Sequence, residues 1–197
     1  MLHPLITMLL CSALVGHAWA GTADQDQARE VAGVNLPACL HRPGQPLLLN
    51  GAGLRRIMLL KVYVAALYLP RHLHDAHTIL DQDMPRLMQL TLLRDLTTDQ
   101  NVEALKGGLE ANNSERELAA LAPEVERFLG YIRSLHAVPA GTVIQLDYLP
   151  GAGTRVTVGH RLLGTVPGEA FNRAVLRIWL GEEPVQTSLK KALLGEG

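Results

Sequence analysis

Arg55 and Tyr63 are the two side chains of this sequence whose types and spacing suggest a binding site. They lie in the apolar stretch of residues 47–70, which reads LLLNGAGLRRIMLLKVYVAALYLP. A guanidinium accepts a carboxylate through two parallel hydrogen bonds, and a tyrosine hydroxyl donates a third. A cation in an apolar segment is tolerated when it is paired or when it faces a cavity that receives an anion. Arg55 therefore predicts either an ion pair with an acid or an anion-binding cavity, and Tyr63 is either a second donor to that anion or an ordinary core tyrosine.

The spacing of these residues constrains the structure that must position them. On one continuous strand, Arg55 and Tyr63 would share a face but lie ~26 Å apart. They can bind one ligand only if the chain folds back between them. The β-branched and aromatic content, with Gly51 and Gly53, favours two strands buried on both faces of a sheet and joined by a tight turn or bulge. A transmembrane span is not expected, because the cations within the segment would be costly in a bilayer.

The remaining chain alternates between strand and helix patterns. Predicted strands cover residues 31–40, 86–93 and 142–166, and predicted helices follow Thr97, span 115–121, 123–135 and 168–180, and begin again at Ser188. Residues 71–85 are polar and predict a connection. This order predicts an α+β fold, with the helices packed on one side of a mostly antiparallel sheet.

The first 20 residues predict a signal peptide. Residues 5–15 are an apolar run of the expected length, and Ala18 and Ala20 are the small residues of a cleavage site. Cleavage near Ala20 would leave residues 21–197, which is enough for one domain. The mature protein is then expected to be periplasmic or secreted, with no integral membrane span after cleavage.

The charge balance restricts the partners. The sequence has 18 basic and 19 acidic residues, and its net charge is −1. It has no basic stripe of the kind that binds phosphate backbones, so nucleic acid is not an expected partner.

The apolar segment resembles the chalcone isomerase-like family, in its bacterial exported branch. The matching motifs are Gly51-Ala52-Gly53-Leu54-Arg55, Lys61-Val62-Tyr63, Leu67-Tyr68-Leu69 and the C-terminal stretch FNRAVLRIWLGEEPVQTSLKKALLG at 171–195. The resemblance implies an open-faced β-sandwich of the chalcone isomerase type. It extends over nearly the whole mature chain.

The resemblance also implies a ligand. Plant plastid fatty-acid-binding proteins of this fold carry Arg and Tyr at the positions of Arg55 and Tyr63, and a small polar residue at the position of Asn172. These positions hold a carboxylate while the acyl chain lies between sheet and helices. The resemblance thus implies a small apolar or amphipathic, fatty-acid-like carboxylic acid as ligand, with Arg55, Tyr63 and Asn172 as binding residues and no cofactor.

Chalcone isomerase activity itself is not expected. Of the residues that carry the isomerisation in plant enzymes only Arg55 is kept, since Asn101 and Gly108 stand where those enzymes have tyrosine and asparagine. Two alternatives remain open. One is an isomerase of the intramolecular lyase type, with Arg55 as electrophile and Tyr63 as proton donor. The other is a structural or partner-binding periplasmic protein.

A histidine cluster between two predicted strands has the side chains of a metal site. It consists of His72, His74, Asp75 and His77. Histidines in such connections are usually solvated, and no second acidic pattern supports the cluster. We therefore predict no metal site here.

Overall fold

The computed structural model describes residues 28–42, 45–135 and 137–196. The predicted signal peptide at residues 1–20 lies outside the described residues. The strands are β1 (Arg29–Val31), β2 (Val34–Leu36), β3 (Cys39–Leu40), β4 (Leu47–Ile57), β5 (Leu60–Leu69), β6 (Arg86–Leu92), β7 (Leu96–Thr97), β8 (Ala137–Val138), β9 (Val143–Leu149), β10 (Gly153–Val158) and β11 (Arg161–Val166). The helices are α1 (Ala76–Asp81), α2 (Thr98–Asn112), α3 (Glu115–Ala120), α4 (Ala122–Arg133), α5 (Glu169–Leu180) and α6 (Thr187–Leu193).

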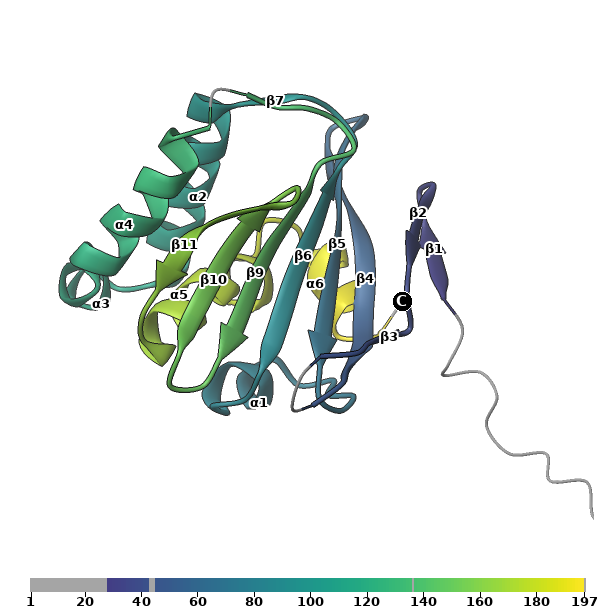
Figure 1. The fold of residues 1–197 in the computed structure, drawn as a ribbon, viewed down its shortest axis with the longest axis horizontal. Coiled ribbons are helices and arrows are strands. Elements are labelled where there is room, and N and C mark those ends of the chain that lie inside the picture. The colour runs from purple at the N-terminus through teal and green to yellow at the C-terminus, as the bar shows by residue number, and fades with distance from the viewer. Residues whose placement is uncertain (1–27, 43–44, 136, 197) are drawn as a thin grey trace, which may run out of the picture.

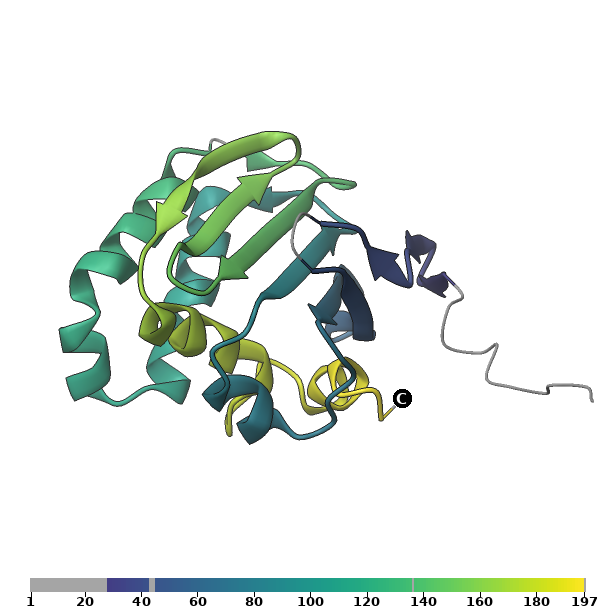
Figure 2. The same cartoon turned by 60° about the horizontal axis from the view of Figure 1, so that its bottom comes forward.

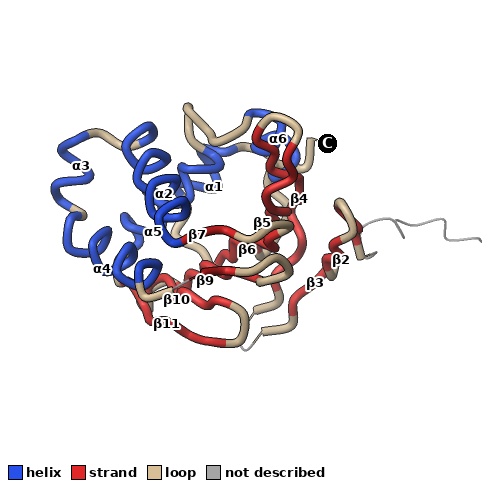
Figure 3. The backbone as a smooth tube through the Cα atoms, turned by 90° about the horizontal axis from the view of Figure 1, so that it is seen from above, coloured by secondary structure: helices blue, strands red, loops and turns tan. Residues whose placement is uncertain are grey.

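A curled antiparallel sheet forms the frame of the molecule (Figure 1). Within the described residues it has seven strands in the order β11-β10-β9-β6-β5-β4-β3. All the helices lie on one side of the strand layer, as Figure 3 shows. The predicted α+β class and the helices on one face of an antiparallel sheet are confirmed.

Strand β5, next to the central strand β6, is buried on both faces along most of its length, as its apolar sequence predicts. Tyr63, Ala65 and Leu67 point toward the helices and join the main core. Val64 and Tyr68 point the other way, into a smaller cluster that includes Leu36 of β2 and Leu47 of β4. The alternation follows from the two-residue period of a strand. In Figure 2 the β1–β2 hairpin lies on the opposite side of the molecule from α3 and α4.

The predicted fold-back between Arg55 and Tyr63 is confirmed. Strands β4 and β5 form a hairpin in which Arg55 and Tyr63 are directly opposite each other. The turn is not at the glycines, however, but at Met58 and Leu59.

The glycines of β4 serve the approach of a helix instead. A Cβ at Gly51 would lie 2.2 Å from the Ala192 carbonyl oxygen, and one at Gly53 would lie 2.7 Å from the Ala192 Cβ. Only residues without a side chain allow α6 to contact this strand. Gly51 follows a bulge in the β4–β5 pairing at Asn50.

The helix starts follow the sequence pattern closely. Thr97 and Gln100 form a capping box at α2, and Ser114 and Glu117 form another at α3. Pro123 lies in the first turn of α4, where a proline needs no amide hydrogen. Among the described residues no helix is both long and apolar enough to cross a membrane.

Helix α1 was not predicted, because its residues read as a polar connection. Its N-cap is Asp75, whose carboxylate accepts a hydrogen bond from the Thr78 amide at 2.7 Å. Ile79 and Leu80 bury the other face of this short helix. Tertiary burial of two side chains therefore stabilises a helix of six residues that could not form alone.

Candidate functional site

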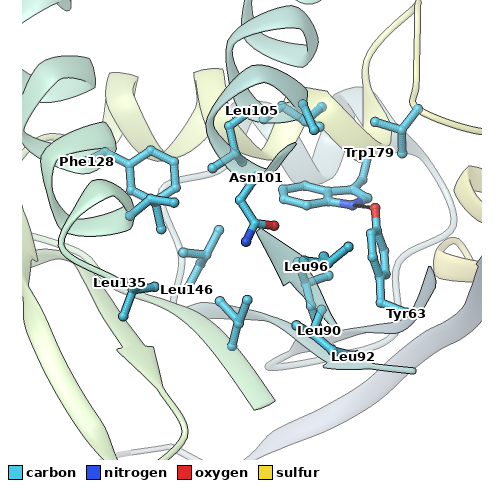
Figure 4. A pocket seen from close by; sticks show the side chains of 15 residues that line it. Tyr63, Leu90, Leu92, Leu96, Asn101, Leu105, Phe128, Leu135, Leu146 and Trp179 are labelled. Carbon is cyan, nitrogen blue, oxygen red and sulfur yellow. Dashed lines mark hydrogen bonds between the residues drawn. The ribbon is translucent and has the colours of Figure 1, made fainter. Parts of the chain in front are cut away.

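An apolar cavity lies between the sheet and the helices, in the place where the resemblance puts a ligand (Figure 4). Its volume is about 90 Å³. Polar side chains in the lining are Tyr63, Asn101 and Trp179. The apolar lining comes from Leu90, Leu92, Leu96, Ala104, Leu105, Phe128, Ile132, Leu135, Ile144, Leu146, Ile178 and Val185. A cavity with a few polar groups among apolar walls is typical of a small-molecule site.

Tyr63 places its hydroxyl at one end of this cavity. The indole Nε1–H of Trp179 donates a hydrogen bond of 3.0 Å to the Tyr63 oxygen. Burial raises the pKa of Tyr63, although the Trp179 bond and the nearby Arg55 guanidinium act in the opposite direction. The hydroxyl therefore stays protonated near neutral pH. Because its oxygen is the acceptor from Trp179, its own hydrogen remains able to donate to a ligand.

Arg55 lies beside Tyr63 but outside the set of side chains that line the cavity. Its Nη1 donates to the Arg56 carbonyl at 2.6 Å and to Gln186 Oε1 at 3.3 Å. The same Gln186 oxygen accepts from the Arg56 amide at 2.9 Å. Among the described contacts, the partners of Arg55 are neutral oxygens. Its charge is thus held in place without being neutralised.

Asn172 is placed apart from Arg55 and Tyr63. Its Oδ1 accepts from Arg86 Nε at 2.6 Å, and its Nδ2 donates to Thr154 Oγ1 at 3.1 Å. All three residues are buried, and none of them lines the apolar cavity. The structure therefore brings Arg55 and Tyr63 together but puts Asn172 in a separate buried polar cluster.

Arg86 is a buried cation that the sequence reasoning did not single out. Its Nη1 donates to the carbonyls of Ile79 and Gln82, the latter at 3.2 Å, at the C-terminal end of α1. Its guanidinium carbon lies 5.2 Å from the centre of the Tyr148 ring. The sequence signal for such a cation is its position, because Arg86 is a charged residue at the start of an apolar strand. The contacts describe a cation that joins α1 to the sheet.

Asn101 and Trp179 line the cavity, although no local sequence pattern marks either of them as a binding residue. Asn101 lies on α2 and points its amide into the cavity (Figure 4). Trp179 belongs to the apolar face of α5 and reads as an ordinary core residue. Gly108, on the same helix as Asn101, instead allows close packing, since a Cβ there would lie 2.9 Å from Ile178 Cγ2.

Two members of the histidine cluster, Asp75 and His74, make structural contacts. Asp75 caps α1, and His74 Nδ1 lies 2.7 Å from the Leu194 carbonyl oxygen. His77 Nε2 lies 3.7 Å from a Glu182 carboxylate oxygen. No group of three or more His, Cys, Asp or Glu side chains in the described residues is arranged to hold a metal ion.

Known proteins resemble this chain in sequence and in fold. The family model described as chalcone isomerase-like matches residues 28–195. Comparison with curated protein sequences gave no match. Among solved structures, the chain is similar to a fatty-acid binding protein from Arabidopsis thaliana, with 18% sequence identity and a TM-score of 0.62. The similarity covers 82% of this chain and 92% of that one. At this identity it shows a common fold.

Proposed function

This chain belongs to the chalcone isomerase-like family, and from that premise we propose that it binds a small, fatty-acid-like carboxylic acid. The acyl chain would occupy the apolar cavity, and the carboxylate would lie at Tyr63 and Arg55. The observation that carries the proposal is the pairing of these two residues across the β4–β5 hairpin, where Tyr63 lines the apolar cavity and Arg55 lies next to Tyr63. The name of the Arabidopsis structure supports the same ligand class.

The electrostatics of Arg55 support a role in anion binding. Its described partners are the Gln186 amide, the Arg56 carbonyl and the Tyr63 hydroxyl, and none of these neutral groups neutralises a cation. A carboxylate would add a charge-assisted bond, which is roughly twice as strong as a neutral one. Gln186 also orients this region, because its Nε2 donates to the Leu54 carbonyl at 3.2 Å. Arg55 is therefore positioned by neutral groups that leave its charge for a ligand.

The size of the cavity limits how the acyl chain is held. A volume of about 90 Å³ is smaller than the ~150 Å³ cavity that accommodates benzene in an engineered protein. Only the first part of an acyl chain fits without movement. A longer chain must extend through the opening or displace the helices that cover the sheet. Short and medium chains are therefore the expected ligands.

Asn172 is not part of the proposed head-group site. Both ends of its amide are engaged by Arg86 and Thr154, and it does not line the cavity. The carboxylate is assigned to Arg55 and Tyr63 alone.

The isomerase alternative has one observation in its favour, which is the protonated Tyr63 hydroxyl beside a cation. An intramolecular lyase needs further groups that orient the substrate. The cavity supplies Asn101 and Trp179 as its other polar side chains. The indole N–H of Trp179 already donates to Tyr63, so it is not free to orient a substrate. Ligand binding is therefore better supported than isomerisation.

We also propose that the protein acts outside the cytoplasm, after removal of residues 1–20. The support is the apolar run and the Ala18-Trp19-Ala20 site in the sequence. N-terminal sequencing of the protein from a bacterial host tests this, because export predicts a chain that begins at Gly21. A cytoplasmic protein that begins at Met1 would contradict it.

The ligand proposal is tested by titration with a fluorescent fatty acid that unlabelled dodecanoate displaces. Arg55→Ala removes a charge-assisted contact worth about 1.5–3 kcal/mol, so the affinity should fall roughly 10- to 150-fold. Arg55→Lys should restore only part of this loss, because an ammonium group cannot reproduce the fork of the guanidinium. Tyr63→Phe should also weaken binding, by the loss of one neutral donor.

Arg56→Ala is the matched control. Arg56 is exposed, and its contacts with Arg55 and Gln186 use only backbone atoms. Its substitution should leave the solution affinity for dodecanoate unchanged. Equal affinities of the wild type and Arg55→Ala would refute the head-group assignment.

A further inference from the structure

The tip of the β4–β5 hairpin exposes four consecutive apolar side chains. The exposed fractions are 52% for Ile57, 92% for Met58, 91% for Leu59 and 55% for Leu60. Among the described residues, the other large apolar side chain that is exposed to this degree is Leu162 at 56%. A contiguous exposed patch of this kind marks an interaction surface more often than a single exposed residue does.

Leu162 lies at the same end of the sheet as this tip. It follows the β10–β11 turn, and the antiparallel pairings from β5 through β6, β9 and β10 put that turn and the β4–β5 turn at one end. Figure 1 shows both turns at the upper end of the sheet, with α1 at the other. The exposed apolar surface of the described chain is therefore concentrated at one end.

Met58 and Leu59, the two residues of the turn, do not favour the folded state. Met58 has a φ of 54°, in the left-handed region that Gly, Asn and Asp adopt most easily. Two-residue hairpin turns strongly prefer these residues. Met58 and Leu59 instead expose two large apolar side chains to water. Their exposure and the strained φ of Met58 do not stabilise the folded chain, and two exposed apolar side chains at a tip are suited to a contact outside the chain.

The surroundings of the tip are cationic. Arg56 and Lys61 are paired across the two strands, and both are exposed. Arg94 is exposed on the neighbouring segment, next to Leu93, whose amide donates to the Val62 carbonyl. No acidic residue occurs between Glu30 and Asp75. Asp95, the acidic residue next to Arg94, is exposed and accepts a hydrogen bond from the Ala140 amide. An apolar tip flanked by Arg56, Lys61 and Arg94 matches a membrane surface with anionic head groups.

We propose that the hairpin tip, residues 57–60, docks on an anionic phospholipid bilayer and inserts Met58 and Leu59 among the head groups. Charge complementarity favours this occupant over a protein groove, since the cations flank the apolar tip and no acidic residue of the hairpin opposes them. This inference does not depend on the proposed function. One extension rests on the proposed function: Tyr63 lies on the strand that begins at Leu60, so docking would bring the cavity to the bilayer that supplies an amphipathic acid.

Flotation with vesicles tests the docking. The purified protein, with its amino terminus determined, is mixed with phosphatidylglycerol vesicles or with phosphatidylcholine vesicles at low and high salt. The wild type should bind the anionic vesicles, and salt should weaken this binding. Met58→Ser with Leu59→Ser should lower the affinity at least tenfold, because the two apolar side chains that would insert into the bilayer are lost. Arg56→Gln with Lys61→Gln should abolish the preference for anionic vesicles.

A matched control variant removes two positive charges outside the hairpin. Arg116→Gln with Arg127→Gln changes two exposed arginines, on α3 and α4, and should leave flotation unchanged. Residues 1–20, if retained, contribute equally to every variant. A second measurement reads the tip directly, since the emission of a Leu59→Trp variant should shift to the blue on anionic vesicles.

Three outcomes would overturn the proposal. They are wild-type protein that does not float, a Met58→Ser/Leu59→Ser variant that floats like the wild type, and an unshifted Leu59→Trp emission. Sedimentation that shows a wild-type dimer and a monomeric serine variant would assign the tip to a second copy. None of these results depends on the dodecanoate titration, so the two proposals fail separately.

Discussion

Arg55 and Arg86 are both cations in apolar strands, but their surroundings give them different roles. Arg86 is 1% exposed and is surrounded by carbonyl oxygens, the Asn172 amide and the Tyr148 ring. Arg55 is half-buried at the end of the sheet and has neutral partners on one of its nitrogens. A fully buried cation fixes neighbouring elements, whereas a half-buried cation can still receive an anion.

Asn172→Ala should therefore change stability rather than ligand affinity. The substitution leaves Arg86 Nε and Thr154 Oγ1 without their partner inside the core. We expect the free energy of unfolding to fall by roughly 2–4 kcal/mol, because the unpaired groups include part of a buried charge. Urea denaturation measures this fall.

Asn101→Ala makes the same chemical change on a helix residue that lines the cavity. It should alter stability much less and should change dodecanoate affinity instead. If the Asn172→Ala protein were stable but had lost affinity for dodecanoate, Asn172 would belong to the binding site.

At the scale of single residues, the sequence predicts which chemistry a side chain can perform better than it predicts where that side chain lies. The resemblance implies the carboxylate chemistry of Arg55 and Tyr63, and their spacing requires the chain to fold back between them, which the hairpin does. The role of Asn172 was inferred from a resemblance. Its partner Arg86 is 86 positions away in sequence, and no local pattern connects two such residues. Side-chain hydrogen bonds over such separations depend on the packing of the whole molecule.

At the scale of elements, the sequence identifies strands and helix caps more reliably than contacts between layers. Thr97 and Ser114 predict helix starts, because their hydroxyls satisfy amides within the same turn. From the sequence, Gly51 and Gly53 predict a tight turn or a bulge. Their lack of a side chain is required by α6, which is about 140 residues later in the chain. Such a requirement is invisible before the fold is known.

Gly51→Ala should accordingly disrupt the contact between β4 and α6. The new Cβ would lie 2.2 Å from the Ala192 carbonyl oxygen and 2.5 Å from that of Leu193. Backbone atoms cannot rotate away, so we expect a loss of roughly 3 kcal/mol in the free energy of unfolding. Thermal and urea denaturation give this value.

Gly107→Ala is the control of identical chemistry. Gly107 lies within α2, and nothing is within 4 Å of a Cβ at that position. Alanine there should stabilise the protein by about 0.5–1 kcal/mol, through helix propensity. If Gly51→Ala proved as stable as Gly107→Ala, the close approach of α6 would not exist in solution.

At the scale of the whole molecule, the sheet separates two apolar layers that contain buried tyrosines. The layer on the helix side holds the cavity with Tyr63, and the opposite layer holds Tyr68. Tyr148, on β9, donates to an Asp83 carboxylate oxygen at 2.5 Å. The fold therefore keeps several phenol groups away from water, and this arrangement has a consequence for stability at high pH.

Stability should fall as the pH rises above about 10. Burial raises the pKa of Tyr63, raises that of Tyr68 to about 12, and together with Asp83 raises that of Tyr148. In the unfolded chain these groups ionise near pH 10. Between the unfolded and folded pKa values the unfolded state therefore binds fewer protons, so stability is complete below pH 10 and is lost above it. Each tyrosine contributes at most about 1.4 kcal/mol per pH unit in this window.

Tyr68→Phe isolates one of these contributions. The Tyr68 hydroxyl is buried and has no hydrogen-bond partner among the described residues, so its removal breaks no described bond. At pH 7 the variant should be as stable as the wild type or more stable, because the desolvation of the hydroxyl is relieved. Urea midpoints measured from pH 8 to above pH 11 should decline less steeply in Tyr68→Phe than in the wild type. Identical slopes would mean that Tyr68 is accessible to hydroxide in the folded protein, and that the layer covered by β1 and β2 opens.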